Sequence, residues 1–302
     1  MRAFTTGIAR SVRSSLGRFL AIAGIVALGC GFFAGLRMCG PDMRAAADAY
    51  YDSTLLWDLR VVSTQGLGEK DLERLAQVGG VRAVAGSTSV DVMARVGSEQ
   101  VAVRVATLPG EYAHGGEPDV NRLELRGGRW PSAPGECVVS ADNPALPASP
   151  GDVVGVLSEA GGSGLLAVDE LTVVGTVSSS AYPYTVSFGS TTLGSGTIDQ
   201  YAFVAPGTFS EEAPYTEAYL TVSGASPYES GGEKYERVVG DVRSALEGEA
   251  GALAEARAED LRSDAQAQVD DARAELEASR AAAESELSDT RSALDAAAAE
   301  IA

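Results

Sequence analysis

Hydrophobic positions are spread unevenly along the chain, and the longest apolar run lies near the N-terminus. Four arginines precede this run, and no charged residue interrupts it from Phe19 to Leu36. At a helical rise of about 1.5 Å per residue, such a run spans roughly 27 Å, close to the hydrocarbon thickness of a bilayer. The pattern therefore predicts a transmembrane helix over residues 19–37.

The flanks of this run indicate an anchor that stays in the membrane. A secretory leader has a shorter apolar core and a cleavage site between small residues, whereas Arg37 and Met38 follow the run here. Neither Cys30 nor Cys39 is preceded by the residues that lipoprotein processing requires. Because basic flanks stay inside, we expect a cytoplasmic N-terminus and an extracytoplasmic location after about residue 37 of a plasma-membrane protein. A cleaved, secreted binding protein is the alternative, which N-terminal sequencing of the expressed protein tests.

Two further patterns concern what the membrane segment contacts. Small residues recur every four positions at Ala23, Ala27, Gly31 and Gly35, so they share one face of the helix. Such a face lets another helix approach closely in lipid, although a composition rich in small residues gives the same spacing. Residues 1–18 place apolar positions four apart among arginines, which is typical of a basic amphipathic helix on membrane lipid or of an ordinary positive flank.

Residues 42–227 alternate strand-like and helix-like pieces, as an extracytoplasmic core domain would. A short helix is expected over residues 68–81, and paired strands over 88–96 and 100–108 with a Gly-Ser-Glu turn between them. Many strands with few helices predict an α+β fold, for which two lobes are one arrangement. The remaining strands are expected at 57–64, 135–141, 151–158, 165–179, 199–205 and 217–224.

Residues 228–302 predict a long helix that forms a coiled coil. No glycine follows Gly251, and alanine, glutamate, arginine, leucine and serine dominate this segment. If it is helical from Ala252, it extends roughly 75 Å, and its narrow apolar seam needs a partner helix. That partner belongs to another subunit or to the return helix of a longer protein, and we expect the second, with this chain as the front part. The seam comprises Val269, Leu276, Leu287, Leu294 and Ile301. Its heptad phase changes between Leu276 and Leu287.

Charge and cysteine content exclude several classes of function. The net charge is −19, and a strongly acidic surface repels phosphate backbones, so we expect no nucleic-acid partner. The three cysteines, Cys30, Cys39 and Cys137, are too few and too scattered for a disulfide framework. Free thiols are expected, with a Cys39–Cys137 bridge as the minor alternative.

The sequence contains no catalytic constellation. Both lysines follow glutamate, which excludes the Gly-Lys-Ser/Thr end of a P-loop. His114 is the single histidine, so a zinc cluster or a Ser-His-Asp triad has no basis. The acidic loop around His114 lacks the spacing of a calcium-binding loop. Tyr182 and Tyr184 form an aromatic patch that contacts a ligand or neighbouring domain, or packs a long loop. We expect no enzymatic activity, no metal and no cofactor.

Several stretches are informative through their order along the chain. They are ARSVRSSLGRFLAIAGIVALGCGFFAGLR, DLRVVSTQGLGEKDLERLAQVGGVRAVAGSTSVDV, LRGGRWPSAPGECVVS, GDVVGV and LTVVGTVSSSAYPY. In this order they resemble the first transmembrane helix of FtsX-like (MacB-like) ABC transporter permeases, the opening of their extracytoplasmic core domain, its Gly-Arg-x-Pro turn and its later strands. The resemblance extends to about residue 245. The alanine-rich helix beyond it resembles the coiled-coil insertion of a long-chain subset of these permeases.

The resemblance implies a permease subunit that has no enzymatic activity of its own. Such permeases pair with a second permease subunit and with a separate cytoplasmic ABC ATPase. ATP-driven closure inside the cell moves their external domains, which extracts lipid or lipoprotein, expels peptide or controls a cell-wall hydrolase. The later helices of that plan are absent from this sequence. A membrane-anchored adaptor of the membrane-fusion type, with a coiled-coil hairpin, is the alternative, and the continuation of the gene discriminates between the two.

Overall fold

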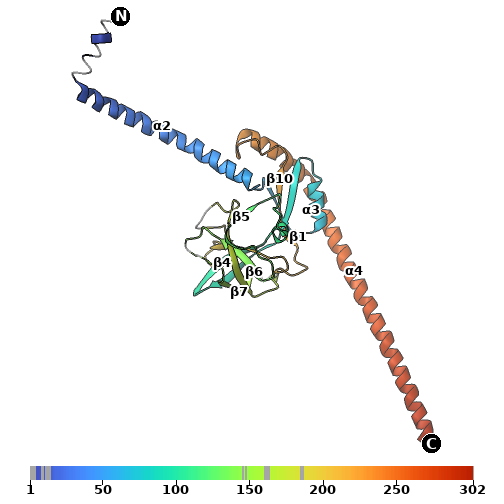
Figure 1. Cartoon of the computed structure of the whole chain (residues 1–302). Coiled ribbons are helices and arrows are strands. Elements are labelled where there is room, and N and C mark those ends of the chain that lie inside the picture. The colour runs from blue at the N-terminus through green and yellow to red at the C-terminus, as the bar shows by residue number, and fades with distance from the viewer. Residues whose placement is uncertain are drawn as a thin grey trace.

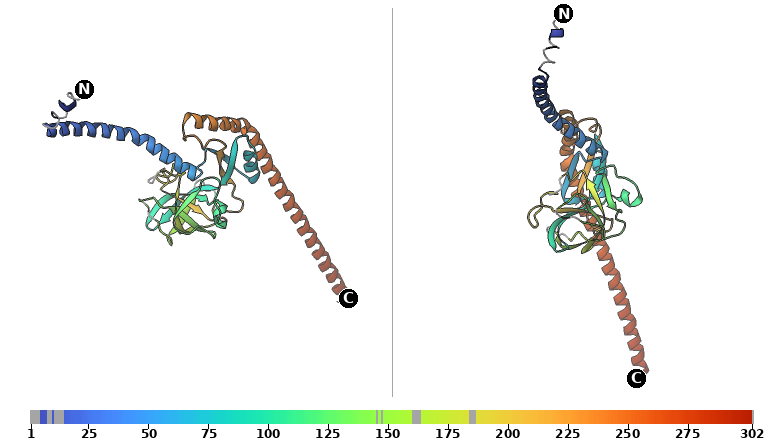
Figure 2. Two further views of the ribbon diagram at one scale, coloured as in Figure 1. Left: turned by 45° about the horizontal axis from the view of Figure 1, so that its top comes forward. Right: turned by 60° about the vertical axis from the view of Figure 1, so that its left-hand side comes forward.

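Two sheets form the body of the molecule, and two long helices leave it in different directions (Figure 1, Figure 2). The computed structural model describes residues 5–7, 10, 15–144, 146, 148–159, 164–183 and 187–301, without the side chains of Ala113, His114 and residues 294–301. The architecture is the predicted α+β fold, with an apolar N-terminal helix and a strand-rich body.

The apolar helix α2 (Leu16–Ser53) is longer than the predicted membrane segment. It continues through Pro41, so residue 42, the predicted start of the core domain, lies inside this helix. By length and composition α2 is the one helix among the described residues that is long and apolar enough to cross a membrane. None of its residues is buried in the chain. The N-terminal amphipathic pattern cannot be compared, because Phe4, Ile8 and Val12 lie outside the described residues.

The smaller sheet and two helices form what we call the α/β lobe. Its three strands, β1 (Leu59–Leu67), β10 (Tyr215–Val222) and β2 (Val81–Ser87), are antiparallel, in that order. Helix α3 (Glu69–Ala76) and the first turns of α4 (Glu233–Ile301) pack on this sheet. The shared core includes Leu67, Leu75, Val78, Leu220, Val222, Val239, Val242 and Leu246.

The larger sheet closes on itself, and we call it the barrel lobe. Its strands run in the order β5-β8-β6-β9-β4-β3-β7, and an additional pairing of β7 with β8 closes the ring. Valine and leucine side chains from the six strands of this ring fill its interior, because alternate residues of a strand face the same side. The strands are β3 (Ser89–Val96), β4 (Glu99–Thr107), β5 (Leu123–Gly128), β6 (Glu136–Ser140), β7 (Val153–Glu159), β8 (Glu170–Ser179) and β9 (Gln200–Val204).

Most predicted elements are confirmed, with three differences. The hairpin of β3 and β4 has the predicted pairing, with Val96 opposite Glu99 across the turn. Strands β2 and β5 were not among the predicted strands. Helix α3 ends at Ala76 rather than at residue 81, whereas α4 begins at Glu233, inside the predicted segment 228–302, although Gly240, Gly248 and Gly251 lie within it. A glycine costs about 1 kcal/mol inside a helix, and the burial of Val239, Val242 and Leu246 offsets that penalty.

The Gly-Gly-Arg turn after β5 has a steric reason. Gly128 has a φ of 76°, and a Cβ there would lie 2.3 Å from the carbonyl oxygen of Val174, so the turn requires glycine. Next to it, Arg129 Nη1 donates to Glu136 Oε2 at 2.8 Å. The Arg129 guanidinium and then the Ser132 N–H hold the pKa of the Glu136 carboxyl at about 2, well below its usual range.

The cysteines are free thiols, as expected. Cys30 and Cys39 are exposed on α2, whereas Cys137 is buried in the barrel lobe, so the minor alternative of a Cys39–Cys137 bridge is wrong. Burial raises the pKa of the Cys137 thiol to about 12, which makes it an inert core residue.

Candidate functional site

The end of α2 adopts an uncommon backbone conformation. The N–H of Leu56 donates to the carbonyl of Tyr51 at 3.0 Å, and the N–H of Leu55 donates to the carbonyl of Asp52 at 3.2 Å. These two bonds make a Schellman motif, whose left-handed position is usually glycine. Here Leu55 occupies that position with a φ of 49°. A side chain in this region costs roughly 1–2 kcal/mol, so the joint after α2 holds strain.

Hydrogen bonds attach this joint to the barrel lobe. Thr54 Oγ1 donates to Ser180 Oγ at 2.7 Å, and both hydroxyls are buried at the end of β8. The N–H groups of Asn121 and Arg122 donate to the carbonyls of Leu55 and Thr54 at 2.8 and 2.7 Å. Asn121 is itself left-handed, with a φ of 55°. Among the described residues, Leu55 and Asn121 are the two non-glycine residues with positive φ, and they contact each other.

Asp58 attaches the same segment to the α/β lobe and to α4. Its Oδ2 accepts the N–H of Val222 at 2.7 Å, at the end of β10, and its Oδ1 accepts the hydroxyl of Tyr235 at 2.6 Å, in the first turn of α4. Burial, and then the hydrogen bond to Asp58, raise the pKa of Tyr235, so this hydroxyl remains a donor. Six residues before the joint, on α2, Asp48 Oδ1 accepts the N–H of Ser230 at 2.7 Å.

We call residues 54–58, with Asn121, Ser180 and Tyr235, the α2 joint. A cleft of about 230 Å³ lies against it, between the end of α2, the start of β1 and the start of α4. Its walls include Leu55, Trp57, Asp58, Tyr228 and Tyr235. The joint therefore connects the apolar helix to both lobes and to the long helix.

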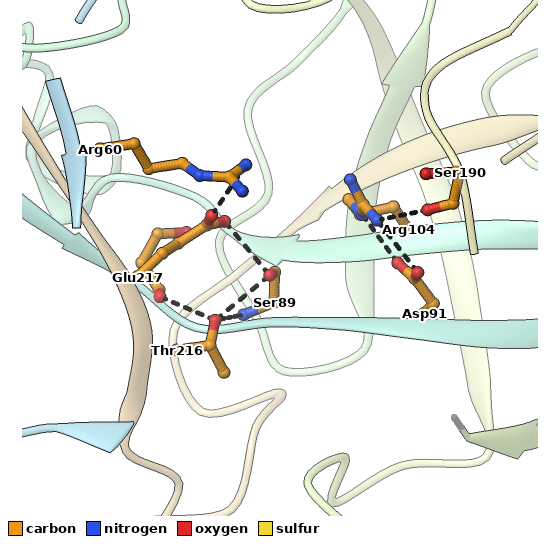
Figure 3. A network of polar contacts seen from close by, with 8 residues as sticks. Arg60, Ser89, Asp91, Arg104, Ser190, Thr216 and Glu217 are labelled. Carbon is orange, nitrogen blue, oxygen red and sulfur yellow. Dashed lines mark hydrogen bonds and ion pairs between the residues drawn. The ribbon is translucent and has the colours of Figure 1, made fainter. Parts of the chain in front are cut away.

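A second polar cluster joins the two lobes to each other, where the chain crosses from β2 to β3 and returns to β10 (Figure 3). Ser89 N–H donates to Thr216 Oγ1 at 2.9 Å, and Ser89 Oγ donates to Glu217 Oε1 at 3.2 Å. Arg60 lies 3.5 Å from the other oxygen of Glu217, whose side chain is 12% exposed. Burial, and then the Glu217 carboxylate, raise the pKa of Tyr219.

The barrel side of this cluster contains a bidentate ion pair. Arg104 donates to both carboxylate oxygens of Asp91, at 2.7 and 3.0 Å, and also to the carbonyl of Ser190. The hydrogen bond to Asp91 raises the pKa of Arg104. Each carboxylate of the cluster thus has a guanidinium partner. Carboxylates that are paired in this way are held in a fixed geometry, and they are not available as a base for proton transfer.

The predicted site residues lie apart from these clusters. Ala23, Ala27, Gly31 and Gly35 are exposed on α2, and a Cβ at Gly31 or Gly35 would meet nothing within 4 Å. On α4 the exposed fractions are 45% for Val269, 69% for Leu276 and 70% for Leu287, while the side chains of Leu294 and Ile301 are outside the description. From residue 261 to 293 every side chain of α4 is exposed. Neither set contacts another described segment.

The aromatic patch predicted around residue 182 is a packing feature. Tyr182 stacks on Tyr201 at 4.5 Å between ring centroids and meets Phe188 edge-on at 6.0 Å. Tyr184 lies outside the described residues. No group of three or more His, Cys, Asp and Glu side chains suited to a metal ion occurs in the described part of the chain.

Sequence reasoning did not find the α2 joint. Thr54, Asp58, Asn121 and Tyr235 are ordinary residues of an acidic chain, and their partners are 64 to 177 positions away. A leucine gives no signal for a left-handed backbone, because glycine or asparagine marks that conformation. The residues are brought together only because the start of β5, the end of β8, β10 and α4 all return to the segment between α2 and β1.

Comparisons with known proteins give structural neighbours. The extracellular domain of the noncanonic ABC-type transporter YknZ from Gram-positive bacteria has 18% identity and a TM-score of 0.32, covering 60% of this chain and 87% of that one. The periplasmic region of MacB from Actinobacillus actinomycetemcomitans has 13% identity and a TM-score of 0.30, covering 62% and 76%. A domain assigned to a permease from Porphyromonas gingivalis has 11% identity and a TM-score of 0.31, covering 61% and 70%.

This chain is similar to the external domains of ABC-type transporter permeases. No protein-family model and no curated protein matches the sequence.

Proposed function

We propose that this chain is the N-terminal part of an ABC transporter permease subunit and has no enzymatic activity of its own. Residues 19–37 span the plasma membrane with the N-terminus in the cytoplasm, the chain from the end of α2 to residue 227 forms an extracytoplasmic core domain, and α4 is the long helix. The subunit works with a separate cytoplasmic ABC ATPase and a second permease subunit. Its external part moves when the ATPase closes, and export or extraction of lipid, peptide or lipoprotein, or control of a cell-wall hydrolase, follows from that movement.

The observation that carries this proposal is the α2 joint. A helix that only anchors a domain needs a flexible linker, whereas α2 is bonded to the body within five residues of its end. The bonds reach β8 through Ser180, β10 through Val222 and α4 through Tyr235. A tilt or shift of α2 is therefore passed to both lobes and to the long helix.

The strain at Leu55 fits a joint that changes conformation. A left-handed leucine is maintained by the surrounding bonds, and a small rearrangement releases it. The neighbouring polar cluster, with its paired charges, holds the two lobes to each other while the joint moves. This division into rigid parts and one strained connection is what force transmission requires.

Helix contacts form the second part of the proposal. The ridge of Ala23, Ala27, Gly31 and Gly35 packs against other membrane helices, because small residues allow close approach in lipid. The seam of Val269, Leu276, Leu287, Leu294 and Ile301 pairs with another helix in a coiled coil. The exposure of α4 beyond residue 260 supports this pairing, since leucines there have no partner within the described chain.

The adaptor alternative shares the anchor, the β-rich body and the coiled coil. It gives no reason for a bonded and strained connection between anchor and body. For that reason we favour the permease.

Two measurements test the proposal in membranes of the producing cell. The first isolates the chain in mild detergent through a tag at Met1 and identifies its partners by mass spectrometry. We expect an ABC ATPase in stoichiometric amount, and its absence with intact tagged protein would contradict the permease role.

The second measurement maps topology in a background in which Cys30 and Cys39 are replaced by serine. Ser98→Cys, at the exposed turn between β3 and β4, should react with a membrane-impermeant maleimide in whole cells. Arg10→Cys, the matched control on the other side, should react only after permeabilisation. Labelling of Arg10→Cys from outside would reverse the proposed orientation.

A further inference from the structure

Helix α4 contacts the body at two places, with an unsupported stretch between them. Val239, Val242 and Leu246 are buried in the core of the α/β lobe, and the helix meets α3 again near Asp260. From residue 247 to 252 every residue is exposed. We call residues 247–252 the unpacked span. A helix that lay flat on the body would bury one face over this length, so the span bridges from one contact to the next.

The space beneath the unpacked span is a groove of about 670 Å³ between α4 and β1. Glu247 and Ala250 of the span line this groove, together with Leu253 just beyond it. On the facing strand, Val62 is 60% exposed. The groove therefore leaves α4 room to move toward β1 while the core residues stay in place.

The unpacked span contains two glycines that have no steric reason to be glycine. A Cβ at Gly248 or Gly251 would meet nothing within 4 Å apart from the turns of α4 itself. Glycine inside a helix costs about 0.5–1 kcal/mol relative to alanine, and closely spaced glycines are places where helices bend. Figure 2 shows that α4 changes direction between its packed first turns and its long free part. The span is therefore the part of α4 that bends at the lowest cost.

Ion pairs to α3 fix the direction of α4 on the far side of the span. Asp260 Oδ2 lies 3.0 Å from Arg74 Nη2, and Asp260 Oδ1 lies 3.6 Å from Lys70 Nζ. Arg257 Nε lies 3.5 Å from Asp71 Oδ2. We call these five residues the α3–α4 ion-pair cluster. Pairs that are open to solvent contribute about 0–1 kcal/mol each, so this contact can be broken without unfolding the body.

One member of the α3–α4 ion-pair cluster is incompletely bonded. Among the described residues, the buried Nε of Arg257 has no hydrogen-bond partner, although Asp71 is close to it. Asp71 accepts the N–H of Gly68 at 2.8 Å and Arg74 Nη1 at 2.9 Å instead. A buried donor without a partner costs about 1–3 kcal/mol. This cost lowers the stability of the observed position of α4 relative to one in which Arg257 reaches solvent.

We propose that the unpacked span is a hinge and that the α3–α4 ion-pair cluster holds it in one position. While the cluster is intact, α4 beyond residue 260 keeps one direction relative to the body. When the ion pairs break, α4 bends at Gly248 and Gly251, and its free part changes direction as a rigid arm. The hinge does not depend on the permease role, since it lies within α3 and α4, and its failure leaves the proposed function as it stands.

The test measures the direction of the free part by spin-label distances in the full chain in lipid nanodiscs. The labels are placed at Gln77→Cys, exposed at the end of α3, and at Ser279→Cys, exposed on the free part of α4. Cys30 and Cys39 are replaced by serine, and unlabelled chain is added in excess, so that each distance is measured within one molecule. We expect a single narrow distribution of distances.

A charge substitution tests the ion-pair cluster. Asp260→Asn removes the pairs with Arg74 and Lys70 and should widen the distribution about twofold. Glu259→Gln is the matched control, because its partner Arg262 belongs to α4 itself, and it should leave the width unchanged.

Glycine substitutions test the hinge in the Asp260→Asn background. Gly248→Ala together with Gly251→Ala stiffens the unpacked span and should reduce the widening by about half or more. Gly240→Ala is the matched control, since a Cβ there also meets nothing within 4 Å but the position lies in the packed turns. It should leave the widening as it is.

Three outcomes would overturn the proposal. If Asp260→Asn has the distribution of the parent, the ion pairs do not hold the arm. If Glu259→Gln widens the distribution as much as Asp260→Asn, the effect is a general loss of surface charge. If both alanines in the span leave the widening unchanged, the bend lies elsewhere in the chain.

Discussion

At the scale of single residues, the unusual features of this protein are two left-handed backbone positions and a set of paired charges. Leu55 takes a left-handed position at the end of α2 that glycine usually fills, and Gly128 takes one that a side chain cannot enter. The first position holds strain at a joint, and the second permits β5 and β8 to approach closely. Charged residues of the body are mostly matched, as Asp91 with Arg104 and Glu136 with Arg129.

The strain at Leu55 can be measured by comparing two truncations. Leu55→Ala and Leu55→Gly both remove the side chain, but only alanine keeps a Cβ in the left-handed conformation. We expect the alanine variant to be less stable than the glycine variant by about 1 kcal/mol. Chemical unfolding of the full chain in detergent micelles gives the difference. The same pair at Ser53, in the helical part of α2, should show the opposite order.

The pair of Arg129 and Glu136 predicts a pH dependence of stability. The carboxyl has a pKa of about 2 in the folded chain, below its unfolded value, so its stabilisation is present above the unfolded pKa and is lost as pH falls toward 2. We expect Glu136→Gln to lower the midpoint of thermal unfolding by about 2 °C at pH 7 and to have little effect near pH 2. Glu99→Gln, at an exposed turn, is the control, and a difference that is independent of pH would contradict this account.

At the scale of elements, each long helix has one part that contacts the body and one part that does not. α2 is bonded at its C-terminal end and exposed along its apolar length. α4 is packed in its first turns, with ion pairs to α3 such as Arg74 with Asp260 at 3.0 Å, and is exposed after residue 260. The free parts carry the ridge and the seam that we propose to pack against other helices.

The bond between Thr54 and Ser180 is the element-scale connection from α2 to β8. Thr54→Ala leaves the buried Ser180 hydroxyl without this partner, which costs roughly 1–3 kcal/mol, whereas after Ser180→Ala the Thr54 hydroxyl still donates to the carbonyl of Tyr50 at 2.9 Å. In a double-mutant cycle we expect the effect of Thr54→Ala together with Ser180→Ala to be smaller than the sum of the single effects by about 1 kcal/mol. Additive effects in unfolding experiments would show that the two hydroxyls do not cooperate.

If the seam of α4 pairs with another helix, substitutions at two neighbouring positions of α4 should affect that pairing differently. Leu287→Glu places a charge in the proposed helix pairing, whereas Ser288→Glu places it on the adjacent face. We expect the first substitution to abolish cysteine cross-linking of α4 to its partner helix and the second to leave it intact. Both positions are in the exposed part of the helix, so the body remains folded. Equal cross-linking of the two variants would place the seam elsewhere.

At the scale of the whole molecule, the body is a connection between two helices that point away from it in different directions (Figure 1, Figure 2). The barrel lobe is inserted between β2 and β10 of the α/β lobe, so both chain crossings lie at one junction. Asp58 lies where α2 ends, β1 begins and α4 starts. We propose that movement of one helix reaches the other through these hydrogen bonds.

Loss of Asp58 should separate these movements. In the proposed complex with a cytoplasmic ATPase, spin labels at Glu99→Cys and Ser263→Cys, with Cys30 and Cys39 replaced, report the distance between barrel lobe and α4. We expect ATP to change this distance in the parent and to change it at most half as much in Asp58→Ala, while ATP hydrolysis continues. Tyr228→Phe, in the wall of the same cleft, is the control. An unchanged response in Asp58→Ala would exclude this carboxylate as the connection.

The sequence alone determined the features that depend on residues close together along the chain. Apolar length identified α2, alternation identified the hairpin of β3 and β4, and the lack of glycine and proline identified the free part of α4. These features follow from periodicity within a few residues. The resemblance to a permease family also depended on the order of local stretches.

Tertiary structure alone decided how those pieces are connected. The closure of the barrel by β7 and β8, the place of β10 between β1 and β2, and the early start of α4 all depend on contacts between distant segments. The α2 joint is of the same kind, because the left-handed Leu55 accepts the Asn121 N–H and the preceding Thr54 accepts the Arg122 N–H, both from a distant segment. The identity of one residue gives no signal of such long-range bonds. The sequence therefore did not predict that Leu55, at the end of α2, takes a strained left-handed conformation.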